Sequence, residues 1–448
     1  MRQVLLLSLL VSTLLMSTSL AAQSPPEVLT FQRVIELATL QAPDAYTAQA
    51  QIDVARAQQD GVAADRLPTI GFSSSLSPTV QQTVPLLSKD EDALCSANSV
   101  ACSVGSSPVG SARTGVSVDL RWRLLDFGAT GAAVDQSGQA LNAAQARAQA
   151  ATARGVAKAL KSYYAVIADD ELVQVRARLA EDRARQAEVV KARAELGAGV
   201  PSDVLQAEVA AEAAALDLET ARAQARTDRI ALAGALGLRP SADIVVQGVL
   251  AIDIAKDVSA VDVDAHPDVK AAVAEEKSAQ FGIVRAERSM WPTIDGSMSV
   301  GASLVALTRP DANFTPSAGL GLSLAWPLMD FGKQADIRAA QASRIVADRS
   351  RAATVTVVAT ERERAMVAYE AQRALVARAT RLQASARQAV DVVEARVQVG
   401  EGRLAELLDA QAALTQAEAS LVSVKASQAQ AAVDVALAAG VVDAASFL

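Results

Sequence analysis

The sequence predicts an α+β membrane protein in which each chain supplies four β-strands and two long helical hairpins. Paired segments alternate apolar and polar residues, and each pair is followed by a long Ala-rich segment with helical periodicity. The whole order occurs twice, and both copies pass from strand to helix at Asp-Phe-Gly, at 126–128 and at 330–332. The spacing from Asp126 to Asp330 agrees within one residue with that from Gly197 to Gly400, which indicates an internal duplication.

The composition agrees with this fold class. Aromatic residues make up only 3% of the 448 residues, which is little for large globular cores. Alanine, glutamine, arginine, glutamate and valine are abundant, as in long helices that pack side by side through small side chains.

The first residues predict export from the cytoplasm. Arg2 is followed by an apolar run from Val4 to Leu15 and by small residues up to Ala22, which is typical of a secretory signal peptide over residues 1–22. No cysteine follows this site, so no lipid anchor is expected. The mature chain has no run of eighteen apolar residues, and we expect no transmembrane helix. An exported chain can still enter a membrane as a closed β-barrel.

The first repeat is predicted over residues 23–238. A helix over 29–65 with a break at Pro43 leads into a β-hairpin over 69–125, whose strands flank a surface loop. In the strand over 114–125, apolar side chains alternate with Ser117, Asp119, Arg121 and Arg123. A helical hairpin over 127–238 follows, with its tip at 197–203, where Ser202 or Asp203 is expected to cap the returning helix.

The second repeat is predicted over residues 265–448, after a linker or equatorial segment over 239–264. It contains a helix that opens at His266-Pro267-Asp268, a β-hairpin over 293–326 and a helical hairpin over 330–440 with its tip at 400–402. At each Asp-Phe-Gly we expect Asp to cap, Phe to pack and Gly to permit the bend. His266 is expected to be a surface turn residue.

Four strands cannot close a barrel, and open sheet edges are excluded from lipid, so the chain must oligomerise. A dimer would give eight strands and a side-chain-filled interior, whereas a trimer would give twelve strands and an open lumen. Small residues on the inward face, such as Gly319, Gly321, Ser297 and Ser299, favour the trimeric twelve-stranded barrel.

Two cysteines, Cys95 and Cys102, lie in the Ser/Gly/Pro-rich loop between the first two strands. In an exported protein we expect them to form a disulfide, and two free thiols are the alternative. A single histidine leaves no metal site to predict, and the net charge of −8 argues against nucleic acid as a partner. No cofactor and no catalytic residues are predicted. The sequence has no Gly-rich phosphate loop, and of the kinase motifs it contains only Asp-Phe-Gly.

Aromatic residues gather where strands meet helices. Such residues are typical of a membrane interface, and the alternative is that they cap the helical core. The predicted membrane-interface residues are Trp122, Phe127, Trp291, Trp326 and Phe331.

The chain combines a signal peptide, a duplicated strand–loop–strand–helix–helix order, paired Asp-Phe-Gly junctions and Gly-x-Gly tips. In these features it resembles the TolC family of outer-membrane efflux proteins, over essentially its whole mature length. The resemblance implies a homotrimer in the outer membrane, with a twelve-stranded β-barrel continuous with a long periplasmic α-helical barrel. It also implies two partners, a periplasmic adaptor protein and an inner-membrane pump of the ABC, RND or MFS type. The function implied is a channel-tunnel for efflux or type I secretion, an exit duct for small molecules or proteins that is gated at the periplasmic helix tips.

Within that family, carboxylates line the periplasmic entrance, and the matching positions here are Glu406 and Asp409. Their i, i+3 spacing puts both on one helix face, and threefold symmetry would gather six carboxylates. The alternative is an ordinary solvated helix start, where acids are favourable in any case. Where some members carry a basic residue, this chain has Gly402, with Arg403 one position later. The salt-bridge latch found in those relatives is therefore not expected at the same position here.

Adaptor docking in the family uses the helix tips, and the alternative for these residues is plain turn chemistry. The candidates are Gly197, Gly199, Val200, Ser202, Asp203, Gly400, Gly402 and Leu404. A periplasmic adaptor or a coiled-coil scaffold is the alternative function. An adaptor, however, would carry one helical hairpin flanked by globular β domains. The sequence does not identify the cargo.

Overall fold

The computed structural model describes residues 28–81, 109–197, 200–240, 244–250, 262–307, 313–399 and 401–442. The predicted signal peptide, Cys95 and Cys102, Gly199, Gly400 and most of the second half of the linker lie outside the described residues. The chain divides into two compact units. Unit 1 comprises Met1–Ala50, Ala146–Lys270 and Thr354–Leu448, and unit 2 comprises Gln51–Gln145 and Ala271–Ala353.

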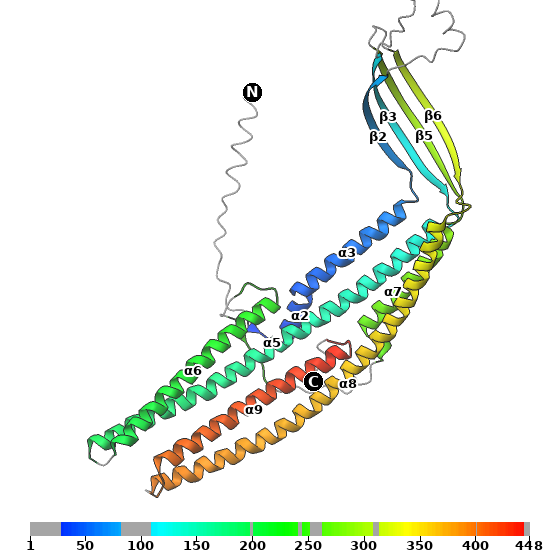
Figure 1. Ribbon diagram of the computed structural model, residues 1–448. Coiled ribbons are helices and arrows are strands. Elements are labelled where there is room, and N and C mark those ends of the chain that lie inside the picture. Colours follow the sequence, from blue (N-terminus) through cyan, green and yellow to red (C-terminus); the bar gives the residue numbers. More distant parts are fainter. Residues whose placement is uncertain are drawn as a thin grey trace, which may run out of the picture. The chain divides into compact units, whose positions relative to one another are not determined.

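Unit 2 contains a four-stranded antiparallel sheet, as the sequence predicts (Figure 1). Its strands are β2 (Thr69–Gln81), β3 (Val109–Leu125), β5 (Thr293–Leu307) and β6 (Asn313–Ala325), in the order β2-β3-β5-β6. The central β3–β5 pairing joins the two repeats, with Val118 opposite Val300. The strands extend beyond the predicted segments because ladder hydrogen bonds continue past the residues that alternate in polarity.

The two faces of this sheet differ in chemistry. Register places Ser73 opposite Ser117 on one face, and Met298 opposite Leu320 on the other. Since side chains alternate between faces, the serines, glycines and charged residues gather on one side and the apolar residues on the other. Among the described residues the apolar side is exposed, with Leu320 89% exposed. An apolar sheet face left open to this extent calls for lipid or another partner.

Four helices contribute to unit 2. They are most of α3 (Pro43–Ala64), the start of α5 (Ala129–Glu195), most of α7 (Pro267–Arg288) and the start of α8 (Phe331–Gln398). Each of them directly precedes or follows one strand of the sheet, so every strand has its own helix.

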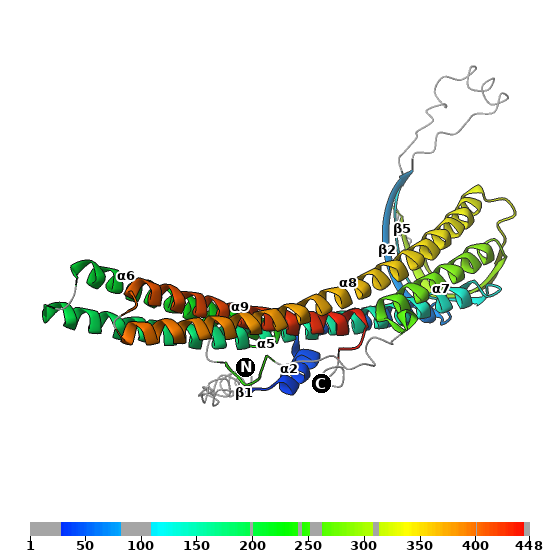
Figure 2. The ribbon, with the colours of Figure 1, turned by 90° about the horizontal axis from the view of Figure 1, so that it is seen from below.

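Unit 1 is built on two antiparallel helix pairs (Figure 2). The 67-residue α5 pairs with α6 (Pro201–Ala235), and the 68-residue α8 pairs with α9 (Leu404–Ala438). Buried alanines such as Ala214 and Ala432 allow close helix packing. The chain breaks at Pro43 as predicted, so that α2 (Phe31–Gln41) precedes α3.

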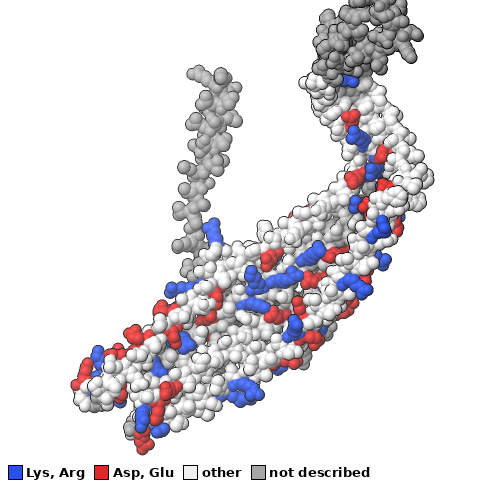
Figure 3. All heavy atoms as spheres, viewed as in Figure 1, with Lys and Arg blue, Asp and Glu red and all other residues white. Residues whose placement is uncertain are grey.

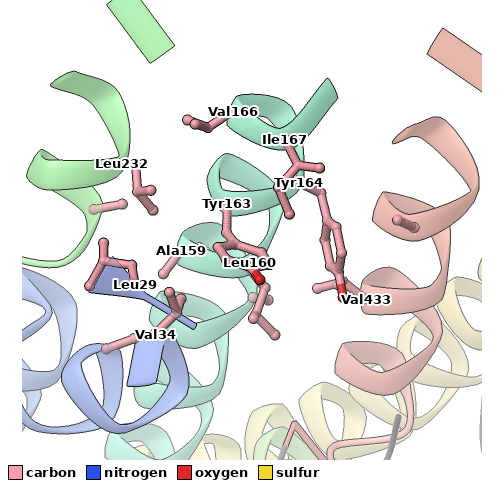
Figure 4. Close-up of a cluster of buried hydrophobic side chains, with 14 of the residues drawn as sticks. Leu29, Val34, Ala159, Leu160, Tyr163, Tyr164, Val166, Ile167, Leu232 and Val433 are labelled. Carbon is pink, nitrogen blue, oxygen red and sulfur yellow. The ribbon is translucent and has the colours of Figure 1, made fainter. Parts of the chain in front are cut away.

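The core of unit 1 surrounds the middle of α5 (Figure 4). Leu160 and Tyr163 lie between Val34 of α2, Leu232 of α6 and Val433 of α9, and all five are buried. This core fixes α5 against three other helices at one level.

The linker contributes to the same core. Its β4 (Val245–Val246) pairs in parallel with β1 (Val28–Leu29), which the sequence did not predict because two-residue strands carry no periodicity. The Tyr163 hydroxyl donates to the Gln247 carbonyl at 2.9 Å. A Cβ on Gly248 would stand 2.2 Å from that hydroxyl, so the Tyr163 side chain can come this close to the linker only because residue 248 is glycine. A short 3₁₀ turn, η2 (Val263–Ala265), then leads into α7.

Lys, Arg, Asp and Glu are interspersed along the helices (Figure 3). No described helix combines the length and the apolar character needed to cross a membrane.

Candidate functional site

At the first Asp-Phe-Gly, Asp126 caps α5. Its carboxylate accepts the backbone N–H groups of Gly128 at 3.0 Å and Thr130 at 2.6 Å. Burial by itself raises the pKa of Asp126, but the hydrogen bonds from Thr130 and Gly128 and the charge of Arg123 outweigh it and hold the pKa below its usual value. Phe127 has φ 51°, a left-handed conformation that is unusual for a bulky side chain, and Gly128 has φ 88°.

The second junction has a different backbone. Asp330 accepts the N–H of Lys333 at 3.1 Å, and Phe331 is already the first residue of α8. Gly332 does not adopt a positive φ, so the prediction that glycine permits a bend is wrong there. The reason is that α8 begins directly after its Asp, whereas α5 begins three residues after Asp126. Phe331 is 72% exposed and does not pack.

The C-terminal end of α7 holds both junctions together. Arg288 donates to the Gly128 carbonyl at 2.9 Å, and Lys333 donates to the Ser289 carbonyl at 2.7 Å. The ring of Phe127 lies 5.7 Å from that of Trp291, centroid to centroid. These contacts bring the two repeats together at the strand ends.

The other predicted interface aromatics lie at the same level of unit 2. The indole N–H of Trp122 donates to the Arg66 carbonyl at 2.9 Å, which leaves the ring partly exposed. Trp326, just after β6, is also exposed. A polar anchor with an exposed ring suits a membrane interface, and the interface role of these residues remains a prediction.

At the tip of the second hairpin, Glu406 and Asp409 are both exposed on the first turns of α9. Arg396 of α8 lies 3.6 Å from the Glu406 carboxylate and also donates to the Glu401 carbonyl at 3.5 Å. Arg403 is the N-cap residue of α9 and makes no side-chain capping bond. The structure therefore pairs one predicted gate carboxylate with an arginine of its own chain.

Arg183 of α5 is a residue that sequence reasoning missed. It is 5% exposed and donates to the Leu408 carbonyl of α9 at 2.6 Å, next to Asp409. Burial lowers the pKa of Arg183, while Asp409 and then Asp182 act in the opposite direction. No local signal in the sequence marks this contact, because it joins helices from different repeats.

The first tip differs from its prediction. The N-cap of α6 is Val200, since the helix begins at Pro201, and Ser202 and Asp203 lie inside the first turn. Proline at the first helical position, whose N–H needs no partner, moves the start forward. Gly197 has φ 78°, as a helix C-terminus requires.

The second tip needs its glycine for another reason. A Cβ on Gly402 would stand 2.6 Å from Cγ2 and 2.9 Å from the backbone nitrogen of Val397. The predicted docking residues also differ in exposure: Val200 is exposed, whereas Leu404 is partly buried.

Two further polar features lie in unit 1. Asp169 of α5 and Asp228 of α6 form a carboxyl pair across the first hairpin, and Arg229 contacts Asp170 beside it. His266 is buried rather than on the surface, with its Nδ1 accepting the N–H of Asp268 at 3.2 Å. In the described ranges, no group of three His, Cys, Asp or Glu residues is arranged to hold a metal ion.

Comparison with known proteins gives consistent matches. The family model described as "Outer membrane efflux protein" matches residues 34–238 and 263–441. Protein CyaE of Bordetella pertussis is 30% identical over 308 residues, which are 66% of this chain and 64% of CyaE. The match thus spans less than two thirds of that relative.

Solved structures share the fold. A membrane protein from Pseudomonas aeruginosa is 20% identical with a TM-score of 0.72, covering 92% of this chain and 90% of that one. The Campylobacter jejuni CmeC outer membrane channel is 17% identical with a TM-score of 0.71, covering 91% of this chain and 85% of that one.

Proposed function

Because the chain belongs to the outer membrane efflux protein family, we propose that it is the exit duct of a tripartite efflux or type I secretion system. The family consists of trimeric outer-membrane channels with a periplasmic extension, which transport rather than catalyse. In our proposal a periplasmic adaptor protein and an inner-membrane pump of the ABC, RND or MFS type deliver cargo, and small molecules or proteins pass through the duct passively.

The sheet of unit 2 carries this proposal. One face is apolar and exposed, the other is polar, and β2 and β6 are edge strands within the chain. Unpaired strand edges cannot face lipid, so β6 of one copy must pair with β2 of the next. Three copies give a closed sheet of twelve strands with its serines and glycines around a lumen.

The helix tips of unit 1 supply the proposed gate and docking surface. Glu406 and Asp409 would form a ring of carboxylates that attracts cations, with Arg396 offsetting part of the charge of Glu406. Exposed Val200, with Gly197 and Gly402 shaping the turns, is the proposed contact for the adaptor. Neither the site geometry nor the name of the relative CyaE supports a particular cargo.

The test separates the duct from its alternatives. We expect the protein in the outer-membrane fraction as a trimer that requires detergent, shifts its gel mobility on heating and conducts ions in planar bilayers. A monomer in the soluble periplasmic fraction would instead support a scaffold or an adaptor.

A further inference from the structure

Unit 2 contains a charged hollow at the end of the sheet that the proposed function does not use. It has a volume of about 290 Å³ and lies between the C-terminal end of α3, the end of β3 and the first turn of α5. That volume is on the order of ten water molecules in the liquid. Its lining includes Asp65, Arg66, Trp122, Asp126 and Gly131.

Two adjacent side chains of opposite charge line this hollow. Asp65 and Arg66 are both exposed, and neither makes an ion pair or a side-chain hydrogen bond within the part of the chain that the structure describes. The other two charged groups in the hollow are occupied. Asp126 caps α5, and Arg123 lies 3.2 Å from the Asp295 carboxylate.

Arg66 lies beside the start of α5. Its Nη2 lies 3.7 Å from the point where a Cβ on Gly131 would stand, so the guanidinium lies against the first turn of α5. The Asp126 carboxylate already accepts the N–H groups at this helix start, which leaves the Arg66 guanidinium as the group in the hollow that can bind an anion. Arg66 therefore favours an anionic ligand group such as phosphate.

The residues around the hollow are of the types found at the level of lipid headgroups. Trp122 closes one side of the hollow, with its indole N–H fixed to the Arg66 carbonyl, and its ring belongs to the apolar face of the sheet. Leu124 and Leu125 are also part of the lining and are exposed. Tryptophan and exposed leucine beside charged groups are typical of the boundary between hydrocarbon and headgroups.

We propose that this hollow binds the headgroup of a zwitterionic phospholipid, with its phosphate at Arg66 and its amine at Asp65. A purely anionic headgroup would place no cation beside the unpartnered Asp65 carboxylate. The proposal rests on the proposed function, because it needs the sheet to lie in a membrane.

Native mass spectrometry of the detergent-purified trimer tests this site. Trimers are incubated with phosphatidylethanolamine or phosphatidylglycerol at equal mole fraction, and the lipid retained is counted. We expect the wild type to prefer phosphatidylethanolamine, Arg66→Gln to lose about tenfold in affinity for both lipids, and Asp65→Asn to lose only the preference. Arg56→Gln is the matched control, since Arg56 is in α3, which ends just before Arg66, and pairs with Asp53 at 3.8 Å.

The outcomes separate this site from the proposed duct. Equal retention of both lipids by the wild type, or no change in Arg66→Gln, would overturn the headgroup site while trimers still conduct ions. Displacement of lipid by inorganic phosphate alone would also contradict it, because the ligand would then be a free anion. Trimers that fall apart only in Arg66→Gln would show that Arg66 contacts a neighbouring copy instead. Failure of the wild type to form conducting trimers would refute the duct itself.

Discussion

The carboxyl groups of Asp169 and Asp228 are neighbours in the first helical hairpin. One oxygen of Asp169, Oδ2, is buried and has no hydrogen-bond partner among the described residues. Burial, the hydrogen bond and charge of Asp228, and the charge of Asp170 raise the pKa of Asp169 to about 7, against the opposing effect of Arg229. Neighbouring like charges disfavour the ionised carboxylate, which is why Asp228 and Asp170 add to the effect of burial on the pKa of Asp169.

This pair predicts a pH dependence of stability. The pKa of Asp169 rises from its ordinary value of about 3.9 on folding, so the protonated form stabilises the folded state. The stabilisation is complete below the unfolded pKa and is lost as the pH rises through about 7. We expect the melting temperature of the wild-type trimer, followed by circular dichroism, to fall between pH 5 and 8 more steeply than that of Asp169→Asn.

Glu181→Gln is the control for this measurement, because Glu181 is on the same helix and its ion pair with Arg185 is exposed. Parallel pH profiles for the wild type and Asp169→Asn would refute the raised pKa of Asp169.

Single residues were predictable where their role is local. Asp126 caps α5 as predicted, since capping depends on neighbours in the sequence. Arg183 and the Asp169–Asp228 pair were not predictable. Each depends on which helices pack together and at what register, and a single sequence with helices this long leaves that register open.

At the scale of elements, the second tip combines a turn, an ion pair and two exposed carboxylates. The Arg396–Glu406 pair is half exposed, and such pairs contribute about 0–1 kcal/mol. Its main effect is therefore on the local charge of the tip rather than on its stability.

The tip predicts a change in ion selectivity. Removing both carboxylates in the double variant Glu406→Ala/Asp409→Ala takes six negative charges from the trimer and leaves Arg396 uncompensated. We expect cation preference to fall and conductance to change in planar bilayers, with the reversal potential in a salt gradient as the measure. Glu418→Ala, further along α9, is the control, and an unchanged reversal potential in the double variant would remove these residues from the gate.

Long helices and alternating strands were the elements most accessible from the sequence. The proline-free run after Phe127 became the 67-residue α5, because nothing in it interrupts helical hydrogen bonding. The predicted start of α6 was wrong because two signals for a helix start compete here. Ser202 and Asp203 are typical capping residues, but Pro201 is the first helical residue. The β1–β4 pair was not predicted because strands of two residues show no periodicity.

On the scale of the whole molecule, function depends on which sheet face meets lipid. Gly319 and Leu320 are neighbours in β6 and lie on opposite faces, with Gly319 opposite Ser299 and Leu320 opposite Met298. A Cβ at Gly319 would stand 3.3 Å from the Ser299 hydroxyl, a contact that needs only a small adjustment.

These neighbours provide a matched pair of variants. Leu320→Arg places a charge on the apolar face and is expected to cost about 2–4 kcal/mol near the membrane midplane, with loss of heat-modifiable trimer. Gly319→Arg places the same charge on the polar face, where we expect the trimer to form and its selectivity to shift toward anions. If the two variants swapped behaviour, the sheet would face the opposite way.

The pairing of β3 with β5 imposes an order on biogenesis. A β3 strand that has left the ribosome finds its second neighbour only after the whole first helical hairpin and the linker have followed it. Contacts this distant in sequence form slowly, and unpaired apolar strands aggregate in the meantime. The sheet can therefore be completed only when the C-terminal half of the chain is available for pairing.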